Sequence, residues 1–327
     1  MMLAETIFSI QNDTQFEQVA LRVFNHQYIN NKIYQRFCNL LGVTKTSVNC
    51  ITDIPYLPID FFKHEKIISD SAPISKIFTS SGTTGSITSK HYVSDLSIYE
   101  KSFRQGFLHF YGDIKEYIIL ALLPSYLERA GSSLVYMAEK LIQDSNQPES
   151  DFYLYETEKL VTVLQKCISE NKKVLLLGVS FALLDLVENH PITLNDNIIV
   201  IETGGMKGRR KEMIREELHE ILKNGFNVSK IHSEYGMTEL LSQAYSKGGG
   251  IFHCPPWMKI SIRNPEDPLT LLSTNKTGGI NVIDLANINS CSFIATQDLG
   301  KIHKENSFEI LGRFDHSDIR GCNLMAL

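Results

Sequence analysis

The sequence predicts an α/β protein that combines parallel sheet segments and helices with a smaller β-rich part. Three apolar runs, at 117–123, 174–179 and 198–201, alternate with segments in which apolar residues recur at helical spacing. Such near-continuous apolar strands between helices are typical of a parallel sheet that is covered on both faces. Beyond about Gly248, Gly, Pro and Asn become frequent and the helical spacing fades. This change of texture indicates short strands and turns.

The first part of the chain, about residues 1–70, is predicted to be helical. Apolar residues recur every three or four positions between Phe16 and Leu41, as on the buried face of a helix. The Ile-Pro and Leu-Pro pairs at 54–55 and 57–58 then predict an extended connector, because a residue before proline disfavours the helical conformation.

An α/β part at about 71–248 and a β-rich part at about 249–311 follow. The predicted core therefore spans 1–311, and residues 312–327, which include Cys322, are expected to form a hinge-like tail. The helices of the α/β part are predicted at 95–111, 134–142, 181–188 and 207–223, and its fourth strand at 228–232.

Composition excludes several classes of function. The chain has 327 residues, a net charge of −5 and 43% apolar residues, as expected of an ordinary globular protein without a basic face for nucleic acid. The run at 117–123 is too short to span a membrane, and the N-terminus does not resemble a signal peptide. The six cysteines show no CxxC pair, so we expect a cytoplasmic protein. The spacing is poor for the alternative of a zinc site, whose ligands would be His232, His253, Cys254 and Cys291.

A hydroxyl-rich loop, Ser80-Ser81-Gly82-Thr83-Thr84-Gly85, follows a short apolar run. Glycines let several backbone N–H groups point at one place, hydroxyls add donors, and Lys90 adds a positive charge. The loop therefore suits a polyphosphate, although its spacing is not that of a Walker A motif. The alternative is a solvated turn.

Two strand ends carry unusual groups. One predicted strand runs into Glu202-Thr203-Gly204-Gly205, where the glycines allow a flat ligand to approach the backbone. The next runs into Tyr235-Gly236-Met237-Thr238-Glu239. In that segment a ring can stack on a base, a hydroxyl can bind phosphate, and a carboxylate can hold Mg²⁺. The alternatives are a plain strand-to-helix turn and a packed tyrosine before a helix that Thr238 caps.

Two later segments could bind ribose. Asp298 is expected in a turn at 296–300, where a carboxylate can accept both ribose hydroxyls; an Asx turn is the alternative. Arg313, within Gly-Arg-Phe-Asp at 312–315, can act as a planar fork on ribose or phosphate, or form a surface ion pair.

In this order the motifs resemble the adenylate-forming acyl ligase superfamily. More narrowly, the chain is similar to the acyl-protein synthetase family of the bacterial fatty acid reductase complex, found in bioluminescence operons. The resemblance covers about residues 78–322 and includes Leu-Pro-Ser-Tyr-Leu-Glu-Arg at 123–129 and Ile-Arg-Gly-Cys at 319–322. It implies an adenylate-forming ligase-like fold, ATP and Mg²⁺ as cofactors, and the following roles. The β- and γ-phosphates would be held by Ser80, Ser81, Gly82, Thr83, Thr84 and Gly85; the rest of the nucleotide by Gly204, Gly205, Tyr235, Gly236, Thr238, Asp298 and Arg313; and Mg²⁺ by Glu239.

The C-terminal end departs from the superfamily. We expect no counterpart of the usual cap domain with its catalytic lysine, and Lys90 is a candidate replacement. The family carries its acyl thioester on a cysteine in this terminal segment, which implies that Cys322 is the acyl carrier. From the residues alone, Cys322 is interpreted as an ordinary buried or tail cysteine.

The predicted function is ATP-dependent activation of a carboxylic acid, expected to be a fatty acid, as acyl-AMP. The acyl group would then pass to the Cys322 thiol and on to a partner, such as an acyl reductase or another acceptor protein. One alternative is a small-molecule ligase that makes acyl-CoA or releases acyl-AMP. Another is a nucleotide-binding protein without turnover. No nucleic acid partner and no membrane span are expected.

Overall fold

The computed structural model of this chain describes residues 3–69, 73–80, 87–124, 131–206, 210–211 and 213–314. Its α-helices are α1 (Leu3–Ile7), α2 (Asp13–Asn30), α3 (Lys32–Leu40), α4 (Phe61–His64), α5 (Leu96–Tyr111), α6 (Ser133–Ser145), α7 (Thr157–Ser169), α8 (Ser180–Asn189) and α9 (Arg215–Phe226). Its short 3-10 helices are η1 (Ile51–Asp53), η2 (Ile114–Glu116), η3 (Leu285–Asn287) and η4 (Lys304–Asn306).

Two sheets form within the described residues. The small one is a hairpin of β2 (Lys76–Thr79) and β3 (Lys90–Val93). The strands of the large sheet are β1 (Leu57–Pro58), β4 (Ile118–Leu122), β5 (Asp151–Phe152), β6 (Val174–Val179), β7 (Ile198–Thr203), β8 (His232–Tyr235), β9 (Ala244–Ser246), β10 (Phe252–His253), β11 (Met258–Arg263), β12 (Thr277–Asp284), β13 (Phe293–Ile302) and β14 (Phe308–Arg313).

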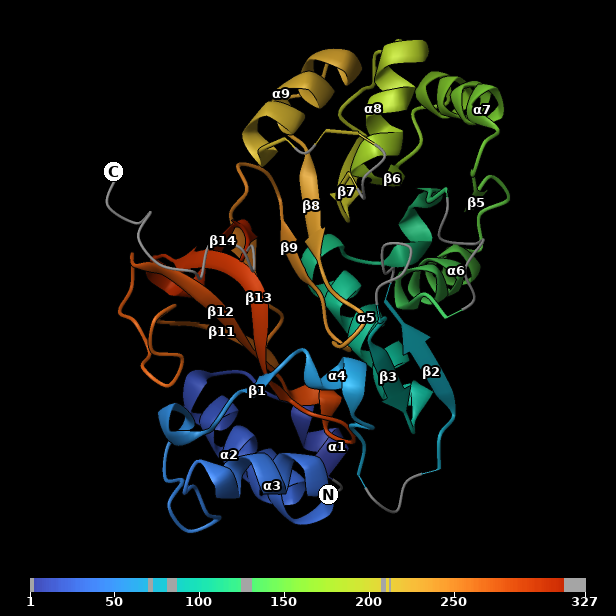
Figure 1. Cartoon of the computed structure of the whole chain (residues 1–327). Coiled ribbons are helices and arrows are strands. Elements are labelled where there is room, and N and C mark those ends of the chain that lie inside the picture. The colour runs from blue at the N-terminus through green and yellow to red at the C-terminus, as the bar shows by residue number, and fades with distance from the viewer. Residues whose placement is uncertain are drawn as a thin grey trace.

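The large sheet changes character at β8. Its order is β11-β12-β13-β14-β10-β9-β8-β7-β6-β4-β5, with β1 paired in parallel to β13. The strands from β5 to β8 are parallel, and those from β8 to β11 are antiparallel. In Figure 1 the parallel half carries α6 to α9, and the antiparallel half lies above the N-terminal helices. The predicted α/β part with a parallel sheet and the predicted β-rich part are both confirmed.

Hydrophobic burial accounts for the parallel half. Every residue of β4 and β6 is buried, as their continuous apolar sequences predicted. Two of the flanking helices, α5 and α6, begin where short polar side chains cap them. Asp95 Oδ1 accepts from Ser97 N at 2.9 Å at the start of α5, and Ser132 caps α6 in the same way.

The N-terminal helices pack against the β-rich part. The rings of Tyr34 and Phe293 stack with centroids 6.0 Å apart, and Phe24 completes this aromatic core. Two fully buried amides add hydrogen bonds. Gln27 Nε2 donates to Asn287 O at 3.0 Å, and Asn31 Nδ2 donates to Ser290 O at 2.9 Å. The side chains of Gln27 and Asn31 therefore fix the main chain around η3 to the N-terminal helices.

Three predicted boundaries are wrong. The helix expected at 207–223 begins at Arg215, because Ile214 is extended and serves as its N-cap. The strand expected at 228–232 begins at His232, since α9 ends at Asn227 in a left-handed conformation and the chain needs several residues to return to the sheet. Asp298 lies inside β13 rather than in a turn.

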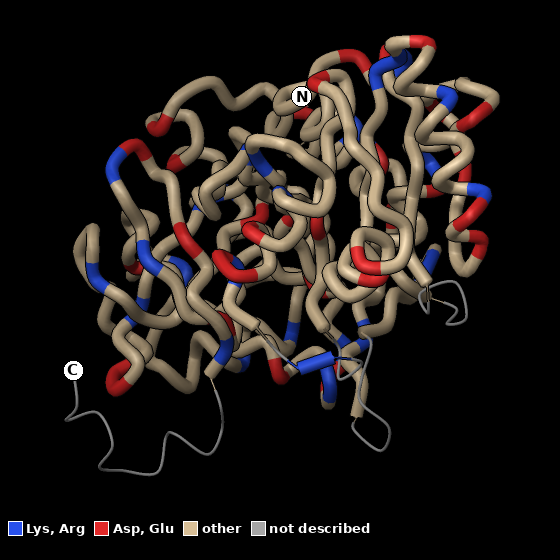
Figure 2. The backbone as a smooth tube through the Cα atoms, turned by 90° about the horizontal axis from the view of Figure 1, so that it is seen from above, with Lys and Arg blue, Asp and Glu red and all other residues tan. Residues whose placement is uncertain are grey.

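Charge is mixed over the molecule. Figure 2 shows Lys and Arg interspersed with Asp and Glu along the described chain, in agreement with the composition. In the part of the chain that the structure describes, no helix combines the length and the apolarity needed to cross a membrane.

Candidate active site

The hairpin of β2 and β3 carries the base of the predicted phosphate loop, by which we mean the paired residues Ser80 and Ser89. Ser80 Oγ accepts from Ser89 N at 2.9 Å, and Ser80 N donates to Ser89 O at 3.1 Å. Lys90 is exposed at the first position of β3, opposite Thr79. The remaining loop residues of the prediction, Ser81, Gly82, Thr83, Thr84 and Gly85, lie outside the described residues.

The same hairpin contacts the 235–239 segment. Ser89 is buried, and its side chain lowers the pKa of the Glu239 carboxyl. His91 Nδ1 lies 2.8 Å from Thr238 O, so the ring bonds the neighbouring main chain. The structure therefore brings the base of the loop and the Thr-Glu pair together.

Glu239 is a buried carboxyl. Its side chain is 5% exposed, and this burial raises its pKa, against the opposing effects of Ser89 and of the positive charge of Arg313. The chain from Gly236 to Gln243 is neither helix nor strand, so Thr238 does not cap a helix here. Asp284 instead fixes this segment by accepting from Leu241 N at 2.7 Å and Ser242 N at 3.0 Å.

Tyr235, Asp298 and Arg313 form a second group. Tyr235 OH donates to Asp298 Oδ2 at 2.8 Å, and Arg313 Nε donates to Asp298 Oδ1 at 3.1 Å. Arg313 and Asp298 are cross-strand partners of β14 and β13. The Tyr235 ring is buried against Phe252 and Phe308, with centroids 6.2 and 5.9 Å away, whereas the Arg313 side chain is 74% exposed.

The glycine pair lies beside the same strand. Gly204 has φ of +75°, which favours glycine there, and directly follows β7. Thr203 Oγ1 donates to Glu234 Oε2, and Gly236 allows the Glu234 carboxyl to lie close to its Cα. Burial, then the neighbouring Glu202 charge, raises the pKa of Glu234 to about 7. The ends of β7 and β8 therefore meet, as expected for neighbouring parallel strands.

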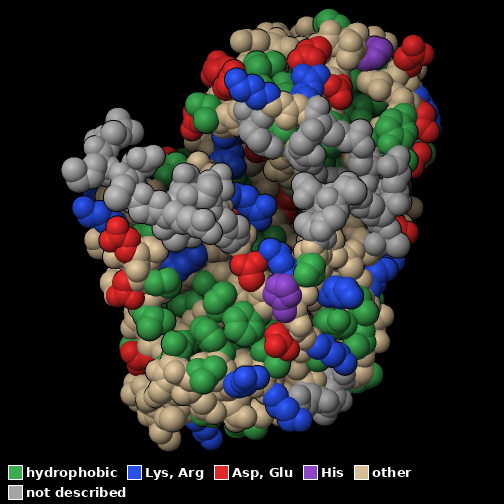
Figure 3. Space-filling model, in the orientation of Figure 1, with side chains coloured by type: hydrophobic (Ala, Val, Ile, Leu, Met, Phe, Trp, Pro, Cys, Tyr) green, Lys and Arg blue, Asp and Glu red, His purple; other side chains and the backbone are tan. Residues whose placement is uncertain are grey.

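Several of the described residues of the prediction thus lie close together, at the end of β8, on β13 and β14 and beside the β2–β3 hairpin. In Figure 3 the molecule is hollowed between its two parts, with both Lys or Arg and Asp or Glu side chains around the hollow. Cys322 lies outside the described residues. No group of three or more His, Cys, Asp and Glu side chains that could hold a metal ion occurs among the residues described.

Sequence reasoning missed several polar residues around this site. Asn287 and Asp284, from the β-rich part, bind the 238–242 main chain, and no local motif marks them. Buried Arg263 donates to Thr296 O, two residues before Asp298. His91 directly follows Lys90 in the chain, and this place next to a candidate phosphate-binding lysine is a usable signal.

The fold and the grouping of these residues define a class, that of the adenylate-forming ligases. A structure of 2-hydroxyisobutyryl-CoA ligase in complex with 2-HIB-AMP and CoA is similar with a TM-score of 0.66 at 12% identity, over 94% of this chain and 70% of that chain. ATP-bound MatB from Rhodopseudomonas palustris is similar with a TM-score of 0.57 at 17% identity, over 73% of this chain and 48% of that chain. This chain therefore spans about half the length of MatB.

The chain belongs to the acyl-protein synthetase LuxE family, whose model matches residues 6–105 and 127–326. It is similar to the long-chain-fatty-acid–luciferin-component ligase of Vibrio harveyi, with 23% identity over 345 residues, which covers 97% of this chain and 89% of that protein. The predicted fold class, family and enzyme class, an acyl-protein synthetase of the adenylate-forming type, are confirmed.

Proposed function

We propose that this protein uses ATP to activate a long-chain fatty acid as acyl-AMP and then carries the acyl group on Cys322. The name of the Vibrio harveyi relative supports a long-chain fatty acid as the substrate. The observation that carries the proposal is the convergence of the Ser80–Ser89 pair, the Thr238–Glu239 pair and Asp298 in a chain of this family.

Asp298 suits a ribose. Its carboxylate accepts from Tyr235 and Arg313, and two oxygens with about four lone-pair sites leave room for further donors. Arg313 is exposed beside it and can reach a ribose or phosphate oxygen. In this proposal the remaining nucleotide contacts come from the 80–85 loop with Lys90, and from Gly204, Gly205, Tyr235, Gly236 and Thr238.

Glu239 is the residue that would hold Mg²⁺. A buried carboxylate whose ionised form is disfavoured by burial gains from a cation beside it, since the cation offsets the buried charge. Mg²⁺ prefers such oxygen ligands and neutralises phosphate charge when it is bound. Thr238, which precedes Glu239 in the chain, would donate a hydrogen bond to the α-phosphate.

The chemistry needs two displacements. A carboxylate oxygen of the acid attacks the α-phosphorus, the bond from this phosphorus to the bridging oxygen breaks, and pyrophosphate leaves. The Cys322 thiolate then attacks the acyl carbon and AMP leaves, while the thiol proton passes to solvent. Positioning and charge neutralisation account for most of the acceleration of the first step. This step therefore needs no general acid or general base.

The acyl group would pass to a partner protein, for which an acyl reductase is the chemically fitting class, in the cytoplasm. We also propose that residues 1–311 form the adenylating core and that 312–327 act as a tail that brings Cys322 to the cleft. Gly321 supplies backbone freedom for that movement.

Incubation with ATP and a radiolabelled long-chain fatty acid, with and without CoA, tests this function. Label bound to the protein is the expected result. Label found only in soluble acyl-AMP or acyl-CoA would favour the small-molecule ligase. Nucleotide binding with no label in either fraction would favour a protein without turnover.

Cys322→Ser separates the two displacements. This variant should keep acid-dependent ATP–pyrophosphate exchange and lose the hydroxylamine-labile acyl label, because only the acceptor thiol is removed. Cys50→Ser, at a half-buried cysteine of the helical part, is the matched control. Survival of the label in Cys322→Ser would move the acyl carrier to another residue.

A further inference from the structure

Two fully buried polar side chains, His91 and Asn287, contact the main chain of the Thr-Glu pair. Both side chains are 0% exposed. His91 Nδ1 lies 2.8 Å from Thr238 O, and Asn287 Nδ2 donates to Glu239 O at 2.7 Å. His91 Nε2 lies 2.9 Å from Asn287 Oδ1, so the four groups form one closed set of contacts.

The acceptors limit how many hydrogen bonds these contacts hold. The carbonyl oxygen of Thr238 and Oδ1 of Asn287 can only accept, and the neutral ring of His91 carries one hydrogen. We assign this hydrogen to Nδ1, because its contact with Thr238 O is the shorter of the two; Nε2 and Asn287 Oδ1 are then two acceptors without a hydrogen between them. Burial lowers the pKa of His91 to about 4, so near neutral pH two hydrogen bonds hold the main chain: His91 Nδ1 to Thr238 O and Asn287 Nδ2 to Glu239 O.

These contacts matter because Thr238 and Glu239 belong to no helix or strand that would pair their backbone carbonyl groups. The chain from Gly236 to Gln243 is irregular, and buried carbonyls without a helix or strand need side-chain partners. His91 comes from β3, immediately after the hairpin residue Ser89, whose side chain lowers the pKa of the Glu239 carboxyl. Asn287 comes from η3 in the β-rich part, so two distant parts of the chain meet on this pair.

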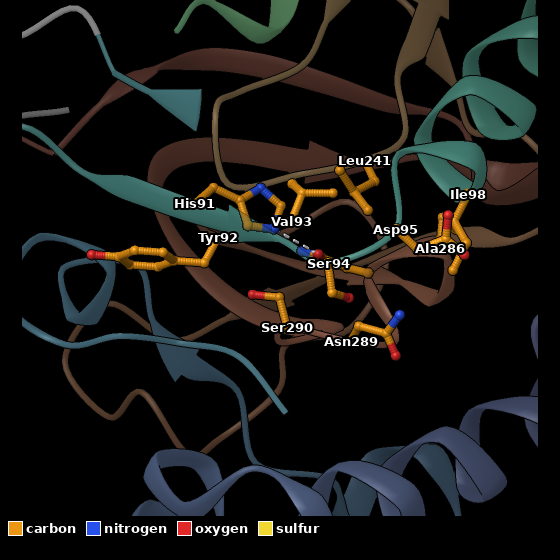
Figure 4. A pocket seen from close by; sticks show the side chains of 11 residues that line it. His91, Tyr92, Val93, Ser94, Asp95, Ile98, Leu241, Ala286, Asn289 and Ser290 are labelled. Atoms are coloured by element: carbon orange, nitrogen blue, oxygen red, sulfur yellow. Dashed lines mark hydrogen bonds between the residues drawn. The ribbon is translucent and has the colours of Figure 1, made fainter. Parts of the chain in front are cut away.

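The surroundings of His91 are tightly built. The Phe62 ring of α4 packs edge-on at 5.7 Å. In Figure 4 the rings of His91 and Tyr92 point to different sides of β3, as side chains of neighbouring strand residues do. The adjoining cavity measures about 10 Å³, roughly the room for one water molecule, so it leaves no space for an organic ligand.

We propose that His91 and Asn287 are positioning residues that hold the 238–239 main chain for adenylation. The proposal rests on the proposed function, since it assigns the Thr238 hydroxyl and the Glu239 carboxylate to the phosphates and Mg²⁺. Small displacements of such groups are costly, because catalytic side chains must be held close to their productive geometry.

A matched variant series tests the role of His91. His91→Asn keeps a donor nitrogen near the position of Nδ1, whereas His91→Leu removes both ring nitrogens. We expect His91→Leu and Asn287→Leu to lower kcat of ATP–pyrophosphate exchange on the order of 10- to 100-fold, with KM for ATP within about threefold of the parent and rates normalised to folded protein. His91→Asn should recover a clear part of that loss, and His253→Leu, at an exposed histidine of β10, should behave as the parent.

Hydrogen–deuterium exchange by mass spectrometry gives a readout that does not depend on activity. His91→Leu should speed exchange in the peptide covering 237–243 and leave α8 and the buried strand β6 unchanged. Unchanged exchange at 237–243, or a His91→Leu rate equal to the parent rate, would overturn the proposal. Exchange that rises throughout the core, with no recovery in His91→Asn, would also overturn it in favour of a purely structural role.

The two failures can be told apart. If the parent protein shows no ATP–pyrophosphate exchange, the proposed function is wrong, and localised deuterium uptake would then support only the structural holding of this segment. If the parent exchanges and the variants match it, the proposed function stands and the positioning role is wrong.

Discussion

At the scale of single residues, the site combines buried carboxyls with exposed basic side chains. Glu239 and Asp298 are 5% and 7% exposed, while Arg313 beside them is largely open to solvent. Buried carboxylates are costly unless hydrogen bonds or cations compensate them. A ligand that brings Mg²⁺ and hydroxyl donors would therefore stabilise the ionised forms of these two carboxyls.

Glu239→Gln is predicted to lower acid-dependent ATP–pyrophosphate exchange on the order of 100-fold, because the variant loses the carboxylate that would hold Mg²⁺. Thr238→Val should also lower the rate, through a lost hydrogen bond to phosphate. Glu266→Gln, on an exposed loop, is the control. Parent-like exchange in both site variants would show that their assigned roles are wrong.

Glu234→Gln is predicted to change how stability depends on pH. Burial raises the pKa of Glu234 from its ordinary 4.5 to about 7 in the folded protein, so between these pH values the folded state holds a proton that the unfolded state has lost. Stability from this group is present below about pH 4.5 and is lost as the pH rises to about 7. Glutamine does not titrate and still accepts from Thr203.

Urea unfolding at pH 5 and pH 8 checks this prediction. The free energy of unfolding of Glu234→Gln minus that of the parent should be about 2 kcal/mol larger at pH 8 than at pH 5. A stability difference that does not change with pH would mean that the Glu234 carboxyl ionises as it would in water.

At the scale of elements, sequence reasoning worked best where burial alone decides the structure. The runs that became β4 and β6 are apolar throughout, and α5 and α6 combine an apolar face with a capping residue. It failed where partners distant in sequence decide the structure. Nothing local to Asp298 indicates that Arg313 pairs across from it, and the irregular 236–243 segment depends on Asp284 and Asn287.

The same limit applies to the site. The glycine and hydroxyl motifs could be found because each is contiguous in the chain. The supporting side chains could not, because Asn287 lies 48 residues from Glu239 and acts only through the fold. The structure also agrees with the alternative that Tyr235 is a packed side chain, since its ring is buried between Phe252 and Phe308.

Helix packing gives a prediction from a matched pair of glycines. A Cβ on Gly225 of α9 would lie 2.5 Å from the Cβ of buried Val187 on α8, whereas a Cβ on Gly106 of α5 would meet nothing within 4 Å. Gly225→Ala should therefore cost about 1–3 kcal/mol of unfolding free energy. Gly106→Ala should gain about 0.5–1 kcal/mol, because alanine favours the helix.

Chemical denaturation of the two variants provides the measurement. Val187→Gly combined with Gly225→Ala should cost less than the sum of the two single substitutions, because only glycine removes the Cβ that lies 2.5 Å away. Equal effects of the two glycine substitutions would contradict the close approach of α8 and α9.

At the scale of the whole molecule, the site lies where the parallel and antiparallel halves of the large sheet meet. β8 belongs to both halves, and its end carries Tyr235. The β-rich half supplies Asp298 and Arg313, and the N-terminal helices support η3 through Gln27. The proposed chemistry therefore depends on contacts between segments from the whole chain.

The most direct test of the central claim is the intact mass of the parent protein after incubation with ATP and a long-chain fatty acid. The account predicts one added acyl group per chain, with the mass of the acid less one water, that requires ATP and is removed by neutral hydroxylamine. An unchanged protein mass, while ATP is converted to AMP and soluble acyl product accumulates, would contradict it.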